Sequence, residues 1–405
     1  MIKRILGLGT FPVVKPIHGG QRRAAAFRNF YQTIGIDYVY TCIYDRDHYA
    51  PALVGPHDIP LIAPESTEGP VALIGDILAG RQGAANEASF QHFLNLIKQV
   101  NPDALQLEQP FLWPLAQRLR QTLGAATLPL IYSSYNVEAP LKDAILVSGG
   151  VASDLRRRIC EAIEQMEAEV CREAALVVCV TPEERNHYLR YAPADTVVVP
   201  NGVDRPPNII EESARCRANF ESRPFVFMVG SAYPPNIDGL CRYVFRDGAF
   251  MVPPIKSIAV CGGVCEGILS HPSYQRFLTA NARRVHFFPE IEDPELWAVK
   301  TACHVVALPI DTGGGSNLKT AEALALGKWI VATTVAMRGY EQFSGAEGLI
   351  IANDSASFRR AIAQALQSPP LNISEASRHG REAVYWDRCF AESGLVVRLP
   401  RVGRN

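Results

Sequence analysis

Short apolar runs alternate along the first half of the chain with stretches that have a helical pattern of apolar and polar positions. The apolar runs, which predict strands, are residues 2–8, 37–44, 71–74, 104–107, 128–132 and 176–181. The helical stretches are residues 21–34, 88–100, 152–174 and a short helix that Thr181 caps ahead of Pro182. This alternation is typical of βαβ units, so it predicts a parallel sheet.

A second series of the same kind follows a join at residues 191–223, where VVVPNGVDRPP ends a strand in a Pro-, Asn- and Gly-rich turn. Its strands are expected at residues 225–229, 257–261, 284–288, 305–308 and 329–332, with helices between them. Both halves therefore predict doubly wound, Rossmann-like α/β domains that face each other across a cleft.

Length and charge narrow the class of protein. The chain has 405 residues, which is long for one domain and enough for two that each bury a core. Its 40 basic and 41 acidic residues lack the basic surplus that is usual in nucleic-acid-binding proteins. No run of about 18 apolar residues is present, and the N-terminus breaks into Gly and Pro too early for a signal peptide. We expect a protein that binds no nucleic acid and is soluble or at most attached to a membrane surface.

The ten cysteines are scattered, without the paired spacing of a zinc site or of a secreted disulfide framework. Cys261 and Cys265 flank a Gly-Gly turn, but the neighbouring sequence supplies no further metal ligands. A reducing cytoplasm fits this usage best, and no metal site is expected.

The segment with the most candidate functional residues is DTGGGSNLKTAEALALGK, at residues 311–328. The apolar run HVVALP before it would bring this segment to the carboxyl edge of a sheet, where α/β proteins bind ligands. The glycines at 313–315 allow positive φ and a close approach to a ligand. Free N–H groups at the start of the next helix favour a phosphate. Lys319 and Glu322 share one helix face, which places a cation for an anionic group beside a carboxylate for sugar hydroxyls.

Two simpler explanations stay open for this segment. A Gly-rich turn between a strand and a helix can serve only to make a tight corner. Lys319 and Glu322 can form a surface i, i+3 ion pair that contributes little to stability.

Several ordered motifs together resemble the retaining GT-B glycosyltransferases of family four, group 1. In chain order they are PVVKPIHGGQRR at 12–23, YNVEAP at 135–140, VTPEE from 180, VVVPNGVD up to 204, FVFMVGSAYPPNIDGL from 225, VHFFPEIEDPELW from 285, the glycine-rich segment at 311–328, and WIVATTVAMRGYE up to 341. Each motif is weak alone, but their order and spacing cover most of the chain.

The resemblance implies an acceptor-binding domain at residues 1–200, a domain that binds a nucleotide-diphosphate sugar at 201–375, and a helix at 376–405 that returns to the N-terminal domain. Glu322 would bond the donor ribose, and N–H groups near Ser316 would hold the diphosphate. The residues expected to be catalytic are Lys319, Glu322 and Tyr135. The residues expected to bind the donor are His18, Gly19, Gly20, Gly230, Ser231, Gly262, Phe287, Gly314, Gly315, Ser316, Asn317, Leu318, Lys319 and Glu322.

The resemblance also implies retaining transfer without a metal and without a cofactor other than the nucleotide-sugar co-substrate. Lys319 and the helix start would stabilise charge on the leaving phosphate. That phosphate can accept the proton of the acceptor, so no carboxylate pair of the glycosidase type is needed. The acceptor would be a hydroxyl of a glycan, a lipid-linked sugar or another molecule, in polysaccharide or glycoconjugate biosynthesis. Peripheral contact with the inner membrane face is left open, as is the oligomeric state.

The chain departs from the family pattern at three places. Gly314 stands where many members have a second Glu, and Ser231 lies in a segment where many have Arg and Lys. Tyr135 replaces the His of an H-N-V-E motif; it can hydrogen-bond a sugar but does not titrate near neutral pH.

These departures keep two alternatives to an active transferase open: a catalytically degenerate binding or partner subunit, and a sugar-nucleotide epimerase. In an active transferase, the negative charge of the phosphates would have to be neutralised by Lys319 together with His18, Arg22 or Arg23.

Two other features have simpler interpretations. Asp45 and Asp47 form a D-x-D, which holds manganese in GT-A enzymes, but the motif is short and a solvated loop pair is preferred. The arginines at 156–158 could contact anionic lipids, but glutamates on the same helix balance them, so a solvated face is preferred.

Overall fold

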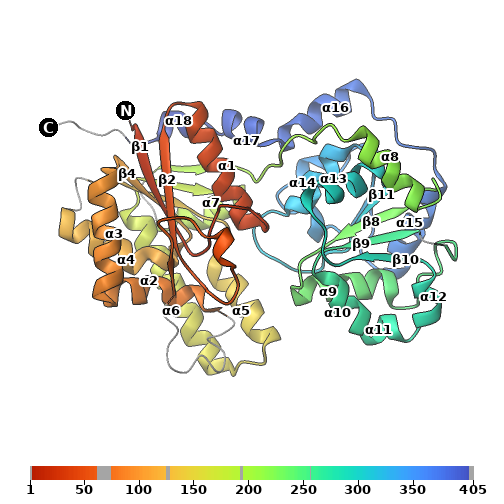
Figure 1. The fold of residues 1–405 in the computed structure, drawn as a ribbon, viewed down its shortest axis with the longest axis horizontal. Coiled ribbons are helices and arrows are strands. Elements are labelled where there is room, and N and C mark those ends of the chain that lie inside the picture. Colours follow the sequence, from red (N-terminus) through yellow and green to blue (C-terminus); the bar gives the residue numbers. More distant parts are fainter. Residues whose placement is uncertain (1, 62–73, 125–127, 192–194, 256, 401–405) are drawn as a thin grey trace. The chain divides into compact units, whose positions relative to one another are not determined.

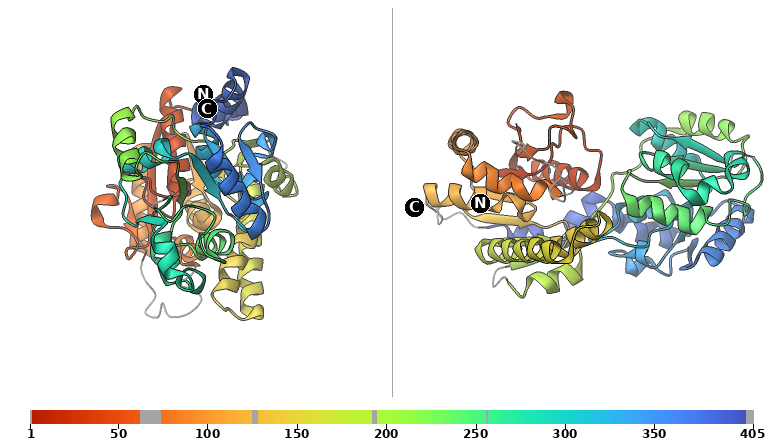
Figure 2. Two further views of the ribbon diagram at one scale, coloured as in Figure 1. Left: turned by 90° about the vertical axis from the view of Figure 1, so that its right-hand side faces the viewer. Right: turned by 90° about the horizontal axis from the view of Figure 1, so that it is seen from below.

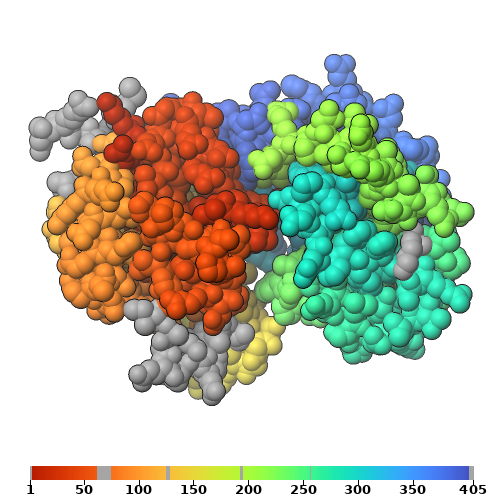
Figure 3. Space-filling model, in the orientation of Figure 1, coloured from red at the N-terminus to blue at the C-terminus, as the bar shows by residue number. Residues whose placement is uncertain are grey.

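The chain folds into two compact units in a computed structural model that describes residues 2–61, 74–124, 128–191, 195–255 and 257–400. Unit 1 comprises Met1–Pro200 with Cys389–Asn405, and unit 2 comprises Asn201–Arg388. Each unit is a parallel β-sheet with helices on both faces (Figure 1, Figure 2). Red to orange segments, early in the chain, form most of the visible surface of unit 1, and green to blue segments form that of unit 2 (Figure 3). None of the helices in the described ranges is long and apolar enough to cross a bilayer.

The described part of unit 1 contains a seven-stranded parallel sheet in the order β3-β2-β1-β4-β5-β6-β7. Its strands are β1 Arg4–Gly9, β2 Asp37–Tyr44, β3 Ile59–Pro60, β4 Ala104–Glu108, β5 Leu130–Ser133, β6 Leu176–Cys179 and β7 Asp195–Val198. Its helices are α1 Gly19–Thr33, α2 Asp76–Ala85, α3 Glu87–Val100, α4 Trp113–Leu123, α5 Glu138–Ser148, α6 Ser153–Glu173 and α7 Pro182–Tyr188, with short turns η1 Pro51–Leu53 and η3 Pro110–Leu112. The strand order reverses between β1 and β4, so their carboxyl ends flank the point where doubly wound proteins bind ligands.

The described part of unit 2 contains a six-stranded parallel sheet in the order β10-β9-β8-β11-β12-β13. Its strands are β8 Val226–Val229, β9 Ile258–Cys261, β10 Val285–Phe288, β11 Val305–Leu308, β12 Trp329–Ala332 and β13 Leu349–Ile351. Its helices are α8 Ile210–Asn219, α9 Pro234–Leu240, α10 Val264–Ser270, α11 Pro272–Gln275, α12 Leu278–Ala282, α13 Asp293–Ala302, α14 Leu318–Leu326, α15 Ser355–Gln367 and α16 Glu375–Arg381. Shorter turns are η5 Cys241–Phe245, η6 Val335–Met337, η7 Glu341–Phe343 and η8 Glu382–Val384. The boundary between the units falls inside α17 Trp386–Ser393, which α18 Leu395–Arg398 follows.

The central strands of unit 2 are apolar on both faces because each face has its own core. Along β8, Val226 and Met228 belong to one apolar cluster, whereas Phe227 belongs to the other. Alternation along a strand sends successive side chains to opposite faces, so helices pack on both. The continuous apolar runs of the sequence follow from this burial.

The predicted fold, two doubly wound α/β sheets, is confirmed. The strands expected at 37–44, 305–308 and 329–332 match β2, β11 and β12 in their bounds. The sequence pattern does not predict the edge strands β3 and β13, which have only two and three residues. Residues 71–73 of the strand expected at 71–74 lie outside the described residues.

Candidate functional site

The glycine-rich segment joins β11 to α14 at the carboxyl edge of the sheet in unit 2. Gly313 has a φ of 144° and Gly315 a φ of 57°, values that residues with a side chain rarely adopt. Asn317 caps the helix, since its side-chain oxygen accepts a hydrogen bond from the N–H of Lys319 at 3.3 Å. The buried hydroxyl of Thr320 donates to a carbonyl of η6 at 2.5 Å. The segment is therefore a defined turn that leads into an anchored helix start.

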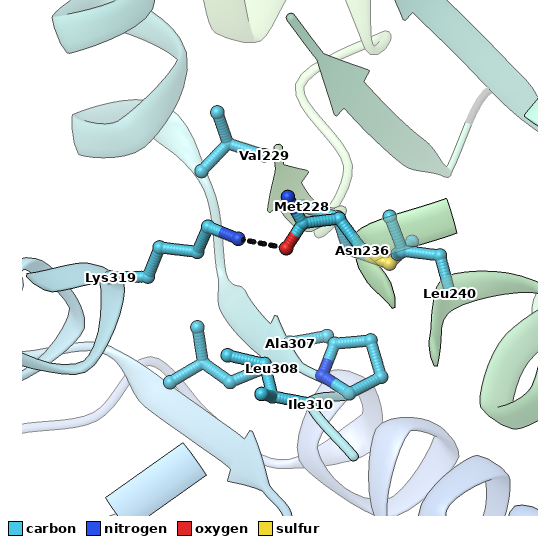
Figure 4. Close-up of a pocket in the computed structure, with 9 residues that line it drawn as sticks. Met228, Val229, Asn236, Leu240, Ala307, Leu308, Ile310 and Lys319 are labelled. Atoms are coloured by element: carbon cyan, nitrogen blue, oxygen red, sulfur yellow. Dashed lines mark hydrogen bonds between the residues drawn. The ribbon is translucent and has the colours of Figure 1, made fainter. Parts of the chain in front are cut away.

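Lys319 extends from the first turn of α14 across a small recess toward Asn236, on α9 (Figure 4). Its Nζ donates to Oδ1 of Asn236 at 2.7 Å. The space between these groups amounts to about 270 Å³, part of which is open solvent. It is lined by Met228, Val229, Asn236, Leu240, Ala307, Leu308, Pro309, Ile310 and Lys319.

The mainly apolar surroundings change the titration of Lys319. Burial lowers its pKa from 10.5 to about 8, and the negative charge of Glu322 opposes that change. The side chain is therefore still mostly an ammonium at neutral pH, but it loses its proton within the range of ordinary assays.

Glu322 forms an ion pair with a residue outside α14. Its Oε2 lies 2.8 Å from Nζ of Lys300, on α13, and the Lys300 side chain is only 2% exposed. The pair neutralises a buried ammonium and fixes the direction of the carboxylate. Lys319 and Glu322 thus lie on one helix, as expected, but each contacts a partner from another element.

The ends of β8 and β9 carry further residues predicted to bind the donor. Gly262, with a φ of 87°, packs so closely on Gly230 that a Cβ there would lie 2.7 Å from the Gly230 carbonyl oxygen. The hydroxyl of Ser231 accepts a hydrogen bond from Nδ2 of Asn236 at 3.2 Å. Asn236 therefore links the end of β8 to Lys319, and the segment after β8 contributes hydroxyl and amide groups instead of the Arg and Lys that many family members have there.

Three other residues that are predicted to bind the donor nucleotide sugar have different surroundings. The Phe287 ring, on β10, packs edge-on against Tyr274 with the ring centroids 5.6 Å apart. Leu318 begins α14 and packs against the core. The hydroxyl oxygen of Ser316 is buried, with no hydrogen-bond partner among the described residues.

Sequence reasoning did not single out Asn236, Lys300 or Arg338. Arg338 donates from Nη2 to the carbonyl oxygen of Gly314 at 2.9 Å, and from Nε to that of Gly315. Asn236 and Arg338 lie inside two of the motifs that carry the resemblance, but their long-range contacts leave no local pattern. Lys300 lies in the last turn of α13, and only the fold shows that its side chain is buried.

In unit 1, the residues predicted to close over the donor phosphates lie at the start of α1. His18 caps that helix: its Nδ1 accepts from the N–H of Gln21 at 3.5 Å, and its Nε2 lies 3.2 Å from the Tyr49 hydroxyl. Although the residue is exposed overall, its ring lies edge-on to Phe11 at 4.9 Å. Desolvation, and then the charge of Arg22, lower the pKa of His18 to about 4. The ring is therefore neutral at pH 7 and adds no positive charge.

Gly19 and Gly20 form the first turn of α1, which packs against aromatic rings. A Cβ on Gly20 would lie 3.0 Å from Cζ of Phe11 and 3.3 Å from the ring of Tyr135. One turn further on, Arg23 is only 1% exposed and donates to the backbone carbonyl just after β7 at 2.9 Å. The charge of Arg23 is therefore held inside unit 1.

Tyr135 contacts a buried carboxylate at the carboxyl end of β4. Its hydroxyl donates to Oε2 of Glu108 at 2.8 Å, while the hydroxyl of Tyr38 and the amide of Gln106 donate to Oε1. Burial, and then the charge of Glu108, raise the pKa of Tyr135 well above its usual value. The phenol stays protonated and acts as a hydrogen-bonding group.

Glu138, in the YNVEAP motif, is the first residue of α5 and is 1% exposed, as is Glu167 on α6. Burial raises the pKa of Glu138 to about 8 and that of Glu167 to about 7. Glu167 accepts hydrogen bonds from the N–H of Glu138 at 3.2 Å and from the hydroxyl of Tyr188 at 3.0 Å. The Glu138 carboxyl is therefore mostly protonated at pH 7.

Two sequence candidates take part in local ion pairs. Asp45 accepts a hydrogen bond from the N–H of Asp47 at 3.0 Å and lies 2.9 Å from His48. Arg156 pairs with Asp143 at 2.6 Å. Over the described ranges, no three His, Cys, Asp or Glu side chains are grouped so that they could hold a metal ion.

Two family models match the sequence. The model described as Glycosyltransferase Family 4 matches residues 46–205, and the model described as Glycosyl transferases group 1 matches residues 223–368. The second match contains the glycine-rich segment together with Lys319 and Glu322.

Several solved structures share the whole fold. Sucrose-phosphate synthase from Thermosynechococcus elongatus has 16% identity and a TM-score of 0.70, with 98% of each chain covered. HepE from Anabaena, in complex with UDP and glucose, has 14% identity and a TM-score of 0.63, with 99% of this chain and 100% of that chain covered. An α,α-trehalose-phosphate synthase (UDP-forming) from Burkholderia xenovorans has 13% identity and a TM-score of 0.60, with 98% of each chain covered. No curated protein matches the sequence. At these identities the likeness shows the fold, which is GT-B.

Proposed function

We propose that this chain, which belongs to the group 1 glycosyltransferases of family four, transfers a sugar from a nucleotide-diphosphate sugar to a hydroxyl group of an acceptor. One observation carries the proposal: the half-buried ammonium of Lys319 lies on the first turn of α14, directly after the positive-φ turn at Gly313 and Gly315. A sugar–diphosphate bond breaks with negative charge developing on the phosphate. Fixed N–H groups, a helix start and an ammonium stabilise such charge.

Glu322 would accept hydrogen bonds from the donor ribose, as the family resemblance implies. An ionised carboxylate is a pure acceptor and therefore suits hydroxyl groups. The contact with Lys300 supports this role, since a carboxylate with a fixed direction loses little conformational freedom when it binds a ligand.

Uridine nucleotides are the first donors to test. Structures of HepE contain UDP, and one contains UDP-glucose, while the trehalose-phosphate synthase is described as UDP-forming. A panel of nucleotide sugars that differ in base and sugar would show which donor this chain uses.

The finer features of the reaction follow from the resemblance and the residue types. We propose that transfer retains the configuration at the sugar carbon without a metal ion, and that the leaving phosphate takes the proton of the acceptor. Tyr135 would bind the acceptor as an uncharged hydrogen-bonding group. The acceptor would be a glycan or a lipid-linked hydroxyl in polysaccharide or glycoconjugate biosynthesis, and the protein would act in the cytoplasm, including at the inner membrane face.

Acceptor-dependent release of nucleoside diphosphate tests the proposal. UDP-, GDP- and ADP-sugars are each incubated with a panel of glycan acceptors, and the anomeric configuration of the product is read by NMR. Lys319→Met should lower turnover by roughly 10² to 10³, as loss of one charge-stabilising donor does. Lys328→Met, just beyond the end of α14, is the matched control and should keep the wild-type rate. Equal turnover in wild type and Lys319→Met contradicts the assigned site.

A catalytically degenerate partner or binding subunit is the second candidate. The observation that favours it is the segment after β8, where Ser231 and Asn236 bond each other in place of two cations. Nucleotide binding without transfer across the whole panel would support this role. A sugar-nucleotide epimerase would instead convert the donor sugar when no acceptor is present.

A further inference from the structure

Arg338 lies directly after η6 and holds two carbonyl groups of the glycine-rich segment. Its Nη2 donates to the Gly314 oxygen at 2.9 Å, and its Nε donates to the Gly315 oxygen. Because the guanidinium is planar and its donors are fixed relative to one another, the contact orients both peptide groups at once. The point-like ammonium of a lysine does not reproduce that geometry.

These contacts set the direction of two N–H groups. In a planar trans peptide, the carbonyl and the N–H of the following residue point in opposite directions. The carbonyls of Gly314 and Gly315 face Arg338, so the N–H groups of Gly315 and Ser316 point away from it. Within the part of the chain that the structure describes, neither N–H donates to a protein acceptor, and the Ser316 hydroxyl oxygen is buried without a partner. Successive N–H groups that face one way form anion-binding concavities.

The backbone that carries Arg338 is tied to both ends of the segment. The Thr333 hydroxyl donates to the Ile310 carbonyl at 2.5 Å, ahead of the glycines. The Thr320 hydroxyl donates to the Ala336 carbonyl at 2.5 Å, beyond them. Both threonines are buried. The turn η6, the glycine-rich segment and the start of α14 therefore form one framework around the guanidinium.

Gly313 leaves room for this contact. A Cβ at Gly313 would lie 3.1 Å from Nη2 of Arg338, and its φ of 144° is unfavourable for any residue with a side chain. The glycine is thus required by the backbone conformation and by the approach of the arginine.

From this geometry we propose that Arg338 is a positioning residue for the donor diphosphate. It acts from behind the loop: by holding the carbonyls of Gly314 and Gly315, it directs the N–H groups of Gly315 and Ser316 toward the β-phosphate. The inference rests on the proposed function and adds the residue that shapes its phosphate site.

Titration calorimetry with matched nucleotides separates this role from general stabilisation. The Kd for UMP divided by the Kd for UDP measures what the β-phosphate adds to binding, and GMP with GDP and AMP with ADP give the same ratio for other bases. In Arg338→Met this ratio should fall about tenfold, the size expected for the loss of aligned hydrogen bonds to a charged group. Arg338→Lys keeps the charge but not the two-point contact, so its ratio should lie between that of Arg338→Met and that of wild type. Arg359→Met removes another partly buried arginine of unit 2, paired with Asp247, and should keep the wild-type ratio.

Each result decides between the two roles. A merely structural arginine weakens both nucleotides alike, so an unchanged ratio in both Arg338 variants overturns the positioning role. The ratio is insensitive to a partly unfolded population, because that population raises both apparent Kd values by the same factor. Wild-type protein that binds none of the diphosphates overturns the proposed function and the role of Arg338 with it.

Discussion

The Nζ atom of Lys300 lies 2.8 Å from Oε2 of Glu322, and this pair joins the middle of the proposed donor site to the interior of unit 2. Lys300 is 2% exposed, so its charge has little access to water. Any variant of Glu322 therefore changes two things at once: a candidate ligand for the donor and the partner of a buried ammonium.

We predict that Glu322→Ala lowers the free energy of unfolding by about 3–5 kcal/mol, because it leaves a buried charge without its partner. The double variant Lys300→Met with Glu322→Leu should recover most of that loss, since apolar side chains of similar volume replace a buried pair well. Chemical denaturation measures both values.

Turnover of the same two proteins separates structure from function. We expect the double variant to be stable but inactive, because the carboxylate for the ribose is gone. Activity that returns together with stability would show that Glu322 serves only to neutralise Lys300.

The pKa of about 8 for Lys319 predicts a pH-dependent affinity for nucleoside diphosphate. The ammonium form attracts phosphate, so affinity should be full below the pKa and should fall as pH rises through it, by up to about tenfold one unit above. Calorimetric titration of UDP from about pH 7 to about pH 9.5 measures this, and it avoids the range in which a terminal phosphate titrates near pH 6. Lys319→Met should remove the dependence.

Asn236→Ala should move that titration to lower pH. The side-chain oxygen of Asn236 accepts from Nζ of Lys319 at 2.7 Å and so favours the charged form. Without this hydrogen bond, burial lowers the pKa of Lys319 further, so the ammonium loses its proton at a lower pH. A midpoint that stays in place, or moves upward, would show that the contact does not tune Lys319.

The raised pKa of Glu138 predicts a loss of stability as pH rises. The folded state holds the proton up to about pH 8, whereas an unfolded chain releases it near the usual value of 4.5. The contribution is therefore fully present below pH 4.5 and is lost as pH rises through about 8. Glu138→Gln keeps the uncharged form at every pH, so its unfolding free energy should fall less than that of wild type between about pH 5 and about pH 9, by an amount on the order of a few kcal/mol. Parallel curves for the two proteins would contradict the assignment.

Tyr135→Phe should affect stability and acceptor use, but not donor binding. It removes one of the donors to the buried Glu108 carboxylate, which should cost about 1.5–3 kcal/mol of unfolding free energy. If Tyr135 also binds the acceptor, the KM for acceptor should rise while the Kd for UDP stays at the wild-type value. An acceptor KM that does not change would leave Tyr135 with its structural role alone.

The sequence predicted the features that repeat along the chain. Apolar runs marked the central strands because each is buried on both faces, as Val226 and Phe227 show on β8. The glycine-rich segment could be recognised as a candidate site from the sequence, because the local backbone angles require glycine at positions 313 and 315. Lys319 was singled out as a candidate site residue from its place in the helix that follows.

The partners of these residues could not be read from the sequence. Asn236 meets Lys319, and Arg338 meets the glycine carbonyls, only after separate βα units pack together. The burial of Arg23 and Glu138 has the same origin, since helix position alone does not show which charged side chain faces the core. The strand β3 was missed because two residues leave no periodic pattern.

A crystal structure of the protein with UDP or another bound nucleoside diphosphate would show directly whether the glycine-rich segment holds the diphosphate. We expect phosphate oxygens about 3 Å from the backbone nitrogens of Gly315 and Ser316, with Lys319 turned to the same diphosphate. A diphosphate bound elsewhere on the protein, with no contact to these two nitrogens, would show that the glycine-rich segment is not the diphosphate site.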